Sequence, residues 1–380
     1  MKARLLLVVA ALVLLVSGCA TFPEEGPRDW RPQADGEGEL GGPPSIAPPE
    51  PKQQQPSEKP EKPGEDGKQQ PTGPCQDPDE RIVTACLGAV GGLVVLPDGE
   101  SALAGELTTG RILRVHRDEK PVVVATVDVD RSAGEGLLGL ALSPAYPEDR
   151  LIYALVRTRD DVRVVRIAQG EPAKPVLAGI PKDVRGGALG LDRNGYLLVA
   201  TGRSAAKPAD RLAGAVLRVD TLGRPAPGNT APGSPVFTTG VTSPGGVCSD
   251  PATGRAWVTD RQERRDVVAP IGKGALGSPL WTWPARPGVA GCALSSGYLA
   301  VVQPALTSVL LLQLNPDGTV SEQPKSVLDK DFGRLRPAAV AQDGLLWTAS
   351  TNKRDGKPAA RDDVVVRMPL APGGGGGDKS

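Results

Sequence analysis

The feature that most constrains the fold of this chain is a motif that returns six times, at steps of about 45 to 60 residues. Each copy has a glycine or alanine, an apolar segment, a turn and a second apolar segment. The copies are GLVVLPDGESALAG from Gly92, GLALSPAYPEDRLIYALV from Gly139, GALGLDRNGYLLVATG from Gly187, GVCSDPATGRAWVTD from Gly246, GCALSSGYLAVVQ from Gly291 and AAVAQDGLLWTAS from Ala338. Regular self-similarity with several short strands per unit is typical of a β-propeller.

A further strand-like segment follows each copy after a variable loop: RILRV at 111, VRVVRI at 162, AVLRV at 215, DVVAPI at 266, SVLLLQL at 308 and DVVVRM at 363. One small twisted sheet cannot cover both of its faces, whereas sheets packed radially bury one another. The 48 glycines and 39 prolines favour turns between short strands over helices. We therefore expect an all-β fold, a six-bladed β-propeller over residues 75–370, with seven blades or a β-sandwich as alternatives.

The N-terminus has the pattern of an export signal. Lys2 and Arg4 precede an apolar run that is too short to span a bilayer. The run ends in Val-Ser-Gly before Cys19, which resembles a bacterial lipobox, and this predicts a lipoprotein signal peptide over residues 1–18 and a lipidated, palmitate-bearing Cys19. The chain is then expected outside the cytoplasm, anchored to the outer face of the cytoplasmic membrane. An ordinary signal peptide with an incidental cysteine is the alternative.

Two segments have compositions that do not support a packed core. Residues 19–74 are rich in Pro, Glu, Gln, Gly and Lys and lack aliphatic runs, so they cannot bury enough apolar area to offset their ordering entropy. We expect a disordered tether there and a Gly-rich disordered tail over residues 371–380. The formal net charge of zero offers no strong field for nucleic acid, so no nucleic-acid partner is expected.

Four cysteines remain after Cys19. An even number in an exported protein favours disulfides over free thiols. Cys75 and Cys86 bracket a short polar loop, and Cys248 and Cys292 occupy matching places in two successive repeats. We therefore pair Cys75 with Cys86 and Cys248 with Cys292. A metal site is the alternative, but the chain has no CxxC spacing and a single histidine, so no metal-binding residues are assigned.

The repeats resemble the glucose/sorbosone dehydrogenase family in order and wording. The segments that carry the resemblance are GEGLLGLALSPAYPEDRLIYALV at 134, GGALGLDRNGYLLVATG at 186, LAGAVLRVDTLGRPAPGN at 212, TTGVTSPGGVCSDPATGRAWVTD at 238 and DDVVVRM at 362. The resemblance implies a six-bladed propeller that uses pyrroloquinoline quinone (PQQ) and calcium to oxidise aldoses. With its lipobox, its Pro-rich segment and LWTWPARPGVAGCA at 280, the chain most resembles the branch of actinobacterial lipoproteins called LppZ.

The catalytic base that this resemblance implies is missing. In the family a histidine takes the proton of the sugar hydroxyl while hydride passes to the quinone. Its place here is taken by Val184, which has no ionisable group. The only histidine, His116, lies in a segment of alternating charges typical of a surface strand end. Arg185 cannot replace the base, because guanidinium stays protonated. No catalytic residue is therefore assigned.

Other positions of the family's site also differ. Arg203 stands where an acidic residue is expected, and Thr242 and Ser243 stand where the family has the Arg and Asn that reach the cofactor. The stretch whose carbonyls help to hold calcium reads Asp260-Arg261-Gln262 in this chain. PQQ and calcium are thus implied by the family but in doubt here.

Three residues keep the family's pattern. Glu135 lies in GEGLLG, and Arg334 and Arg336 in GRLRPAAV match the Arg-x-Arg that holds cofactor carboxylates. Arginine suits such anions because its fork of donors binds a carboxylate in bidentate fashion. Glu135, Arg334 and Arg336 are the candidate cofactor-binding residues, with solvated arginines before a strand as the alternative.

These observations favour a catalytically degenerate propeller that binds a small sugar-like or anionic ligand, or an envelope protein partner, at its central mouth. An active PQQ-dependent aldose dehydrogenase with rearranged catalytic residues is the alternative, and a purely structural module of the cell envelope is a third interpretation.

Overall fold

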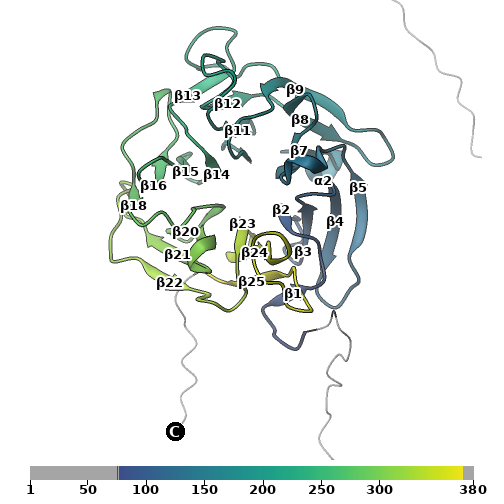
Figure 1. The fold of residues 1–380 in the computed structure, drawn as a ribbon. Coiled ribbons are helices and arrows are strands. Elements are labelled where there is room, and N and C mark those ends of the chain that lie inside the picture. Colours follow the sequence, from purple (N-terminus) through teal and green to yellow (C-terminus); the bar gives the residue numbers. More distant parts are fainter. Residues whose placement is uncertain (1–74, 76, 371–380) are drawn as a thin grey trace, which may run out of the picture. The chain divides into compact units, whose positions relative to one another are not determined.

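A computed structural model describes residues 75 and 77–370, and these residues form a six-bladed β-propeller (Figure 1). The expected fold class is thereby confirmed. The predicted signal peptide, the lipidation site at Cys19, the tether and the Gly-rich tail lie outside the described residues.

Six antiparallel sheets, each built mainly of four strands, follow one another around the ring. Blade 1 consists of β2 (Val90–Val95), β3 (Ser101–Glu106), β4 (Arg111–His116) and β5 (Val122–Thr126). Blade 2 consists of β6 (Leu137–Leu142), β7 (Ile152–Arg157), β8 (Asp161–Ile167) and β9 (Lys174–Pro181). Blade 3 consists of β10 (Ala188–Leu191), β11 (Leu197–Thr201), β12 (Ala215–Val219), β13 (Val236–Thr239) and β17 (Gly274–Ala275). Blade 4 consists of β14 (Pro244–Ser249), β15 (Ala256–Arg261), β16 (Asp266–Pro270) and β18 (Trp281–Trp283). Blade 5 consists of β19 (Cys292–Ser295), β20 (Tyr298–Gln303), β21 (Ser308–Gln313) and β22 (Lys325–Val327). Blade 6 consists of β23 (Leu335–Val340), β24 (Leu345–Ser350), β25 (Val365–Pro369) and β1 (Ile82–Thr84).

The six predicted repeats supply the two inner strands of the six blades, and the six segments that follow them supply the third strands. Short helical turns interrupt the loops at η1 (Arg131–Ala133), α2 (Tyr146–Asp149), η2 (Pro304–Leu306) and α3 (Asn352–Asp355). In blade 3, β17 adds to the outer edge by pairing in parallel with β13.

The first strand of the chain closes the ring. Ile82 pairs with Val366 and Thr84 with Val365, so β1 becomes the outer strand of the blade that the C-terminal repeat builds. The disulfide between Cys75 and Cys86, with a Cα–Cα distance of 5.5 Å, holds the residues on either side of this strand together. Closure by strands from both ends of the chain leaves no blade without a neighbour.

The glycine that begins a repeat allows the inner strands of neighbouring blades to approach closely. A Cβ added to Gly139 would lie 2.9 Å from the backbone nitrogen of Leu189 in the next blade. A Cβ added to Gly291 would lie 2.5 Å from the nitrogen of Ala338. A larger residue at Gly139 or Gly291 would force the inner strands apart, which explains why five of the six repeats begin with glycine; the sixth begins with the small residue Ala338.

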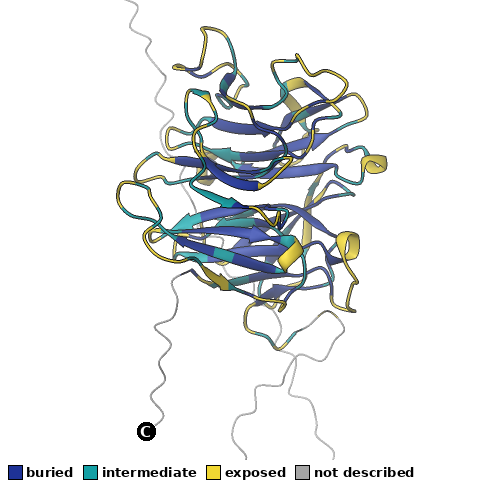
Figure 2. Cartoon of the chain, turned by 60° about the vertical axis from the view of Figure 1, so that its left-hand side comes forward, coloured by how far each residue is buried: buried dark blue, intermediate teal, exposed yellow. Residues whose placement is uncertain are grey.

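Buried side chains fill the spaces between the blades, whereas the loops are exposed (Figure 2). The second predicted disulfide, between Cys248 and Cys292, crosses from blade 4 to blade 5 within a hydrophobic cluster. Trp257 and Trp283 are buried in the same cluster, at 3% and 8% exposure. Both predicted disulfide pairings are confirmed.

The closing strand provides a test of how the ring is held together. Ile82 and Val83 are buried, at 5% and 4% exposure, whereas Val122 and Val123 on the outer strand of blade 1 are 50% and 47% exposed. The double variant Ile82→Ala/Val83→Ala should therefore lose about 3–6 kcal/mol of unfolding free energy in urea titrations. The matched variant Val122→Ala/Val123→Ala should lose less than about 1 kcal/mol. Equal losses would show that β1 does not hold the ring.

Candidate active site

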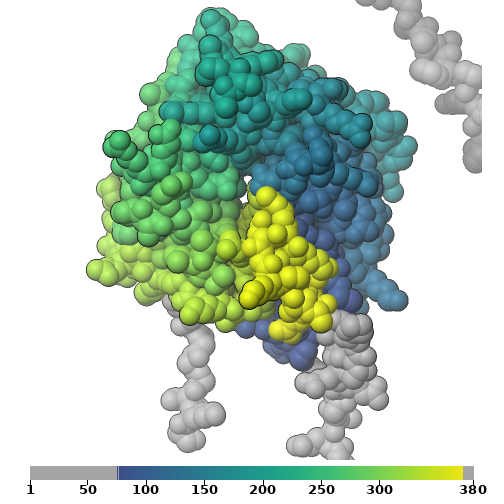
Figure 3. Space-filling view, in the orientation of Figure 1, coloured from purple at the N-terminus to yellow at the C-terminus, as the bar shows by residue number. Residues whose placement is uncertain are grey.

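The loops that join the second strand to the third, and the fourth strand to the next blade, all lie at one end of the propeller because the first four strands of every blade are antiparallel. A cavity of about 710 Å³ opens at this end, which we call the mouth. Figure 3 views the ring from this side, with an opening near its centre beside the yellow C-terminal loops. The mouth is lined by six basic and three acidic side chains: Arg157, Lys182, Arg185, Arg261, Arg286, Arg354, Asp130, Glu135 and Asp183.

Glu135 holds two guanidinium groups from a distant part of the chain. Its Oε1 accepts from Nη1 of Arg336 at 2.7 Å and from Nη1 of Arg354 at 3.0 Å. The side chains of Glu135 and Arg336 are only 20% and 12% exposed. Burial alone would raise the pKa of Glu135, but the positive charges of Arg336, Arg354 and Arg261 outweigh it and lower the pKa to about 2.

Arg157 fixes the backbone of the mouth. This buried side chain ends β7 and donates to the carbonyls of Glu135 at 3.2 Å, of Val184 at 3.0 Å and of Lys182. It therefore ties the loop that enters blade 2 to the loop that enters blade 3. Burial lowers the pKa of Arg157, and the charges of Glu135 and Asp183 oppose that effect.

Asp260 and Arg261, at the end of β15, have different roles. The carboxylate of the fully buried Asp260 accepts from the backbone N–H of Thr242 at 3.0 Å and of Ser243 at 2.6 Å, so it holds the loop that enters blade 4. Arg261 donates through Nε to the carbonyl of Ser243 at 3.3 Å. Burial lowers the pKa of Arg261, and the nearby Arg336 lowers it further. The charge of Glu135 opposes these effects on the pKa of Arg261.

Val184 does not direct its side chain into the mouth as a reactive group. It is 2% exposed and packs in a hydrophobic cluster with Ile180, Leu138 and Leu189. Only its carbonyl takes part in the polar network, as the acceptor of Arg157. Val184, which the sequence resemblance assigns to the histidine position, thus lies in the core between blades 2 and 3.

The three carboxylates of the mouth are weak bases. Glu135 has a pKa of about 2. A hydrogen bond from the backbone N–H of Ala206, followed by one from the Ser204 hydroxyl, lowers the pKa of Asp183. The hydroxyl and N–H of Ser132 lower the pKa of Asp130. A general base works best with a pKa near the operating pH, and none of these groups meets that condition.

The other candidate residues lie apart from the mouth. Arg334 lines a neighbouring cavity of about 330 Å³ together with Phe332 and Asn352. Arg203 lines a third cavity, beside blade 3. His116 ends β4 at the opposite end of the propeller, where its ring lies 3.7 Å from Glu100. Of the three candidate cofactor ligands, the structure thus brings Glu135 and Arg336 together and leaves Arg334 outside.

Sequence reasoning missed Arg157 and Arg354. A signal for Arg157 was present, because arginine stands at or just after the end of the second strand in three successive repeats, at 157, 203 and 261. Strand direction places all three at the mouth end. No comparable signal exists for Arg354, which is part of α3 in a loop of irregular length.

Within residues 75 and 77–370, no group of three or more His, Cys, Asp or Glu side chains is placed to hold a metal ion. No helix in the same part of the chain is long and apolar enough to cross a bilayer.

The comparisons with known proteins agree with this geometry. The model of the family described as glucose/sorbosone dehydrogenase matches residues 90–285, more than half of the chain. The chain belongs to the glucose/sorbosone dehydrogenase family. A search of curated proteins finds no match.

Solved structures of family members resemble the chain closely. The PQQ-bound aldose sugar dehydrogenase of Streptomyces coelicolor is 26% identical with a TM-score of 0.68, over 76% of this chain and 96% of that one. A putative oxidoreductase (glucose dehydrogenase) of Thermus thermophilus is 29% identical with a TM-score of 0.68, over 75% and 98%. The soluble aldose sugar dehydrogenase of Escherichia coli, at 19% identity and a TM-score of 0.64 over 76% and 98%, shows the fold alone.

The mouth fits one part of the family's chemistry and lacks another. PQQ carries three carboxylates, and the guanidinium groups of Arg261 and Arg354, which line the mouth, are suitable partners for such an anion. Val184, the position that the sequence resemblance assigns to the family's histidine, has no ionisable group and is buried among apolar side chains. The donor set therefore supports binding of an anion better than proton abstraction.

The Glu135 ion pairs should make stability depend on pH. Because the pKa of Glu135 is lowered to about 2, its stabilisation is present above its ordinary value of 4.5 and is lost as the pH falls towards 2. Glu135→Gln should reduce the unfolding free energy by about 2–3 kcal/mol at pH 6. The difference from wild type should vanish near pH 2 in urea titrations across this range. Glu119→Gln, which removes a surface pair with Arg114, should change little, and a pH-independent loss in Glu135→Gln would contradict the assignment.

Proposed function

We propose that this chain is a catalytically degenerate member of the sugar dehydrogenase family whose mouth binds a small organic anion. The observation that carries the proposal is the mouth itself: a cluster of guanidinium groups around one carboxylate, with a buried valine at the position of the family's base. Oxidation of an aldose needs a group that accepts the hydroxyl proton, and the three carboxylates that line the mouth all have lowered pKa values. Burial raises the pKa of Asp260, but this carboxylate is fully buried outside the lining and accepts from the backbone of Thr242 and Ser243.

The preference for an anion follows from the uncompensated charges of the mouth. Glu135 neutralises only part of the charge of Arg336 and Arg354, and Arg261 has no carboxylate within ion-pair distance among the described residues. Burial strengthens the attraction of such cations for an anion because the effective dielectric constant is lower than in water. A ligand with one or more carboxylates, of the size of a sugar acid or PQQ, would complete the charge balance.

The proposed location follows from the N-terminus. We propose that Cys19 is lipidated and that the chain is held at the outer face of the cytoplasmic membrane, as in the actinobacterial LppZ branch that it resembles. An envelope protein could share the mouth as a partner of this anchored propeller. More than one acyl chain would hold the protein stably, since each buried methylene contributes about 0.8 kcal/mol.

The mouth can be tested with PQQ as a probe anion. We expect the purified chain to bind PQQ in the presence of calcium, followed by fluorescence, without dye-linked oxidation of a panel of aldoses. Arg261→Gln should weaken binding about tenfold, because a charge-assisted hydrogen bond is lost. Arg193→Gln, on an exposed turn at the opposite end of the propeller, should leave binding unchanged.

Turnover of an aldose with bound PQQ would reject the proposal in favour of the alternative, an active PQQ-dependent aldose dehydrogenase with rearranged catalytic groups. Absence of PQQ binding, together with no effect of citrate or gluconate on thermal unfolding, would also reject it and would favour a structural module of the envelope.

The lipid anchor has its own test. Expressed in an actinobacterial host and labelled with palmitate, the wild-type chain should carry the label and partition with the membrane fraction. Cys19→Ser should lose the label, whereas Cys75→Ser should keep it because that cysteine takes part in a disulfide. Label retained in Cys19→Ser would show that the modification lies elsewhere.

A further inference from the structure

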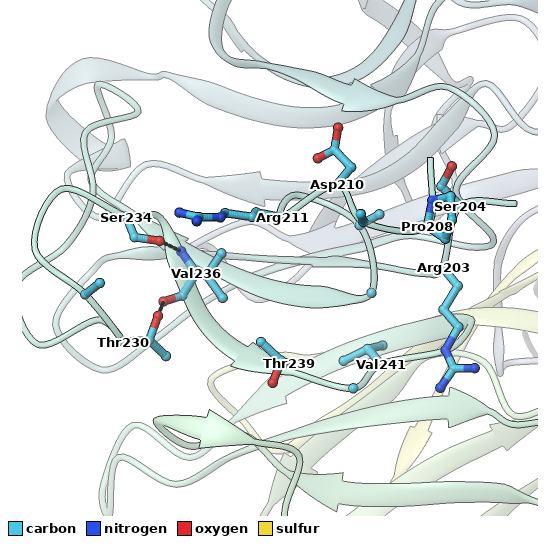
Figure 4. Close-up of a pocket in the computed structure, with 15 residues that line it drawn as sticks. Arg203, Ser204, Pro208, Asp210, Arg211, Thr230, Ser234, Val236, Thr239 and Val241 are labelled. Atoms are coloured by element: carbon cyan, nitrogen blue, oxygen red, sulfur yellow. Dashed lines mark hydrogen bonds between the residues drawn. The ribbon is translucent and has the colours of Figure 1, made fainter. Parts of the chain in front are cut away.

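A second cavity, of about 600 Å³, lies against the outer part of blade 3 (Figure 4). We call it the blade-3 pocket. Its walls are the loop that joins β11 to β12, the strand β13 with the residues just after it, and the loop before β13. It is lined by Arg203, Ser204, Pro208, Ala209, Asp210, Arg211, Ala213, Gly214, Thr230, Ala231, Ser234, Val236, Thr239, Gly240 and Val241.

The blade-3 pocket is separate from the mouth although the two are neighbours. Ser204 lines the pocket and donates to Asp183, which lines the mouth, at 2.7 Å. No residue lines both cavities. A ligand in the pocket would therefore contact side chains that do not line the mouth.

Two hydroxyl groups in the pocket keep hydrogen-bonding sites that the protein does not use. Thr230 donates its hydroxyl proton to the carbonyl of Val236 at 2.8 Å, and Ser234 accepts from the N–H of Val236 at 3.2 Å (Figure 4). A hydroxyl has one donor and two acceptor sites, so Thr230 can still accept and Ser234 can still donate. This pair suits the hydroxyl groups of a sugar, which both donate and accept.

The blade-3 pocket is also lined by charged side chains. The Arg211 side chain has no hydrogen-bond or ion-pair partner within the described residues, and in Figure 4 it extends towards Ser234, with Arg203 at the other side of the pocket. Arg203 has only a distant partner, Glu263 at 3.9 Å. Asp210 uses Oδ1 to accept from the N–H of Leu212, which leaves Oδ2 for a sugar hydroxyl. Two arginines against one carboxylate favour a ligand that carries a negative charge.

The remaining lining is apolar. Pro208, Ala209 and Ala231, which are exposed, offer carbon surface against which the C–H face of a sugar ring can pack. Pockets for small ligands commonly combine such a surface with a few polar groups that fix orientation. From these contacts we propose that the blade-3 pocket binds an acidic saccharide, with a uronate-type carboxylate on Arg211 or Arg203 and ring hydroxyls on Asp210, Thr230 and Ser234.

Calorimetric titration of the full-length chain with trigalacturonate tests this site. Trigalacturonate should bind at least about tenfold more tightly than maltotriose, which has hydroxyls but no carboxylates. Arg211→Gln and Arg203→Gln should each weaken binding about tenfold, through loss of a charge-assisted hydrogen bond. Both residues are exposed, so neither change should disturb the fold. The control is Arg193→Gln, at the opposite end of blade 3, which should bind as wild type does. Arg286→Gln, in the mouth, should weaken binding less than either pocket variant.

Three results would overturn the proposal. If trigalacturonate does not bind, acidic saccharides are not the ligands of this pocket. An equal loss in Arg286→Gln would place the saccharide in the mouth. Equally tight binding of a single-stranded trinucleotide would show attraction of any polyanion, without recognition of a sugar acid.

Discussion

The close radial packing of the inner strands is the constraint on which the rest of this structure depends. Each blade is too small to bury its own faces, so its apolar side chains must meet those of the two neighbouring blades. Glycines such as Gly139 and Gly291 permit that contact by removing the Cβ where the inner strands come nearest. Because each blade relies on both neighbours, the ring also has to close, and β1 and β25 close it from opposite ends of the sequence.

The same packing produces the mouth. When six antiparallel sheets surround one axis, their strand ends converge, and loops that are far apart in sequence meet there. Glu135 and Arg354 are 219 positions apart in sequence, yet their side chains lie 3.0 Å apart. The rigid ring therefore allows single substitutions to change the charge and chemistry of one small volume while the scaffold persists.

The sequence predicted the architecture well because the signals that define blades are local. Hairpin turns, alternating apolar residues and matched cysteines all act within a repeat or between adjacent repeats. The closing strand was not assigned, since three residues, Ile82 to Thr84, are too short to show a period.

The site was predicted only in part. The contact of Glu135 with Arg336 could be expected from the family pattern, whereas Arg334 lies just before β23 and lines another cavity. The contacts of Arg157 with three carbonyls depend on loop geometry that composition does not encode.

The changes at the mouth are physically consistent with one another. A histidine at position 184, as the family pattern would have it, would become cationic in a cavity rich in guanidinium groups, where its protonated form would be disfavoured. Burying Val184 in the cluster with Ile180 and Leu189 also gains apolar contacts between blades 2 and 3. Meanwhile Arg261 and Arg336, whose charges repel, are tolerated because Glu135 stays ionised between them. A site with this excess of positive charge is stabilised by any anion that binds in it, and this is the physical basis of our proposal that the centre of the propeller binds a ligand and does not transfer a proton.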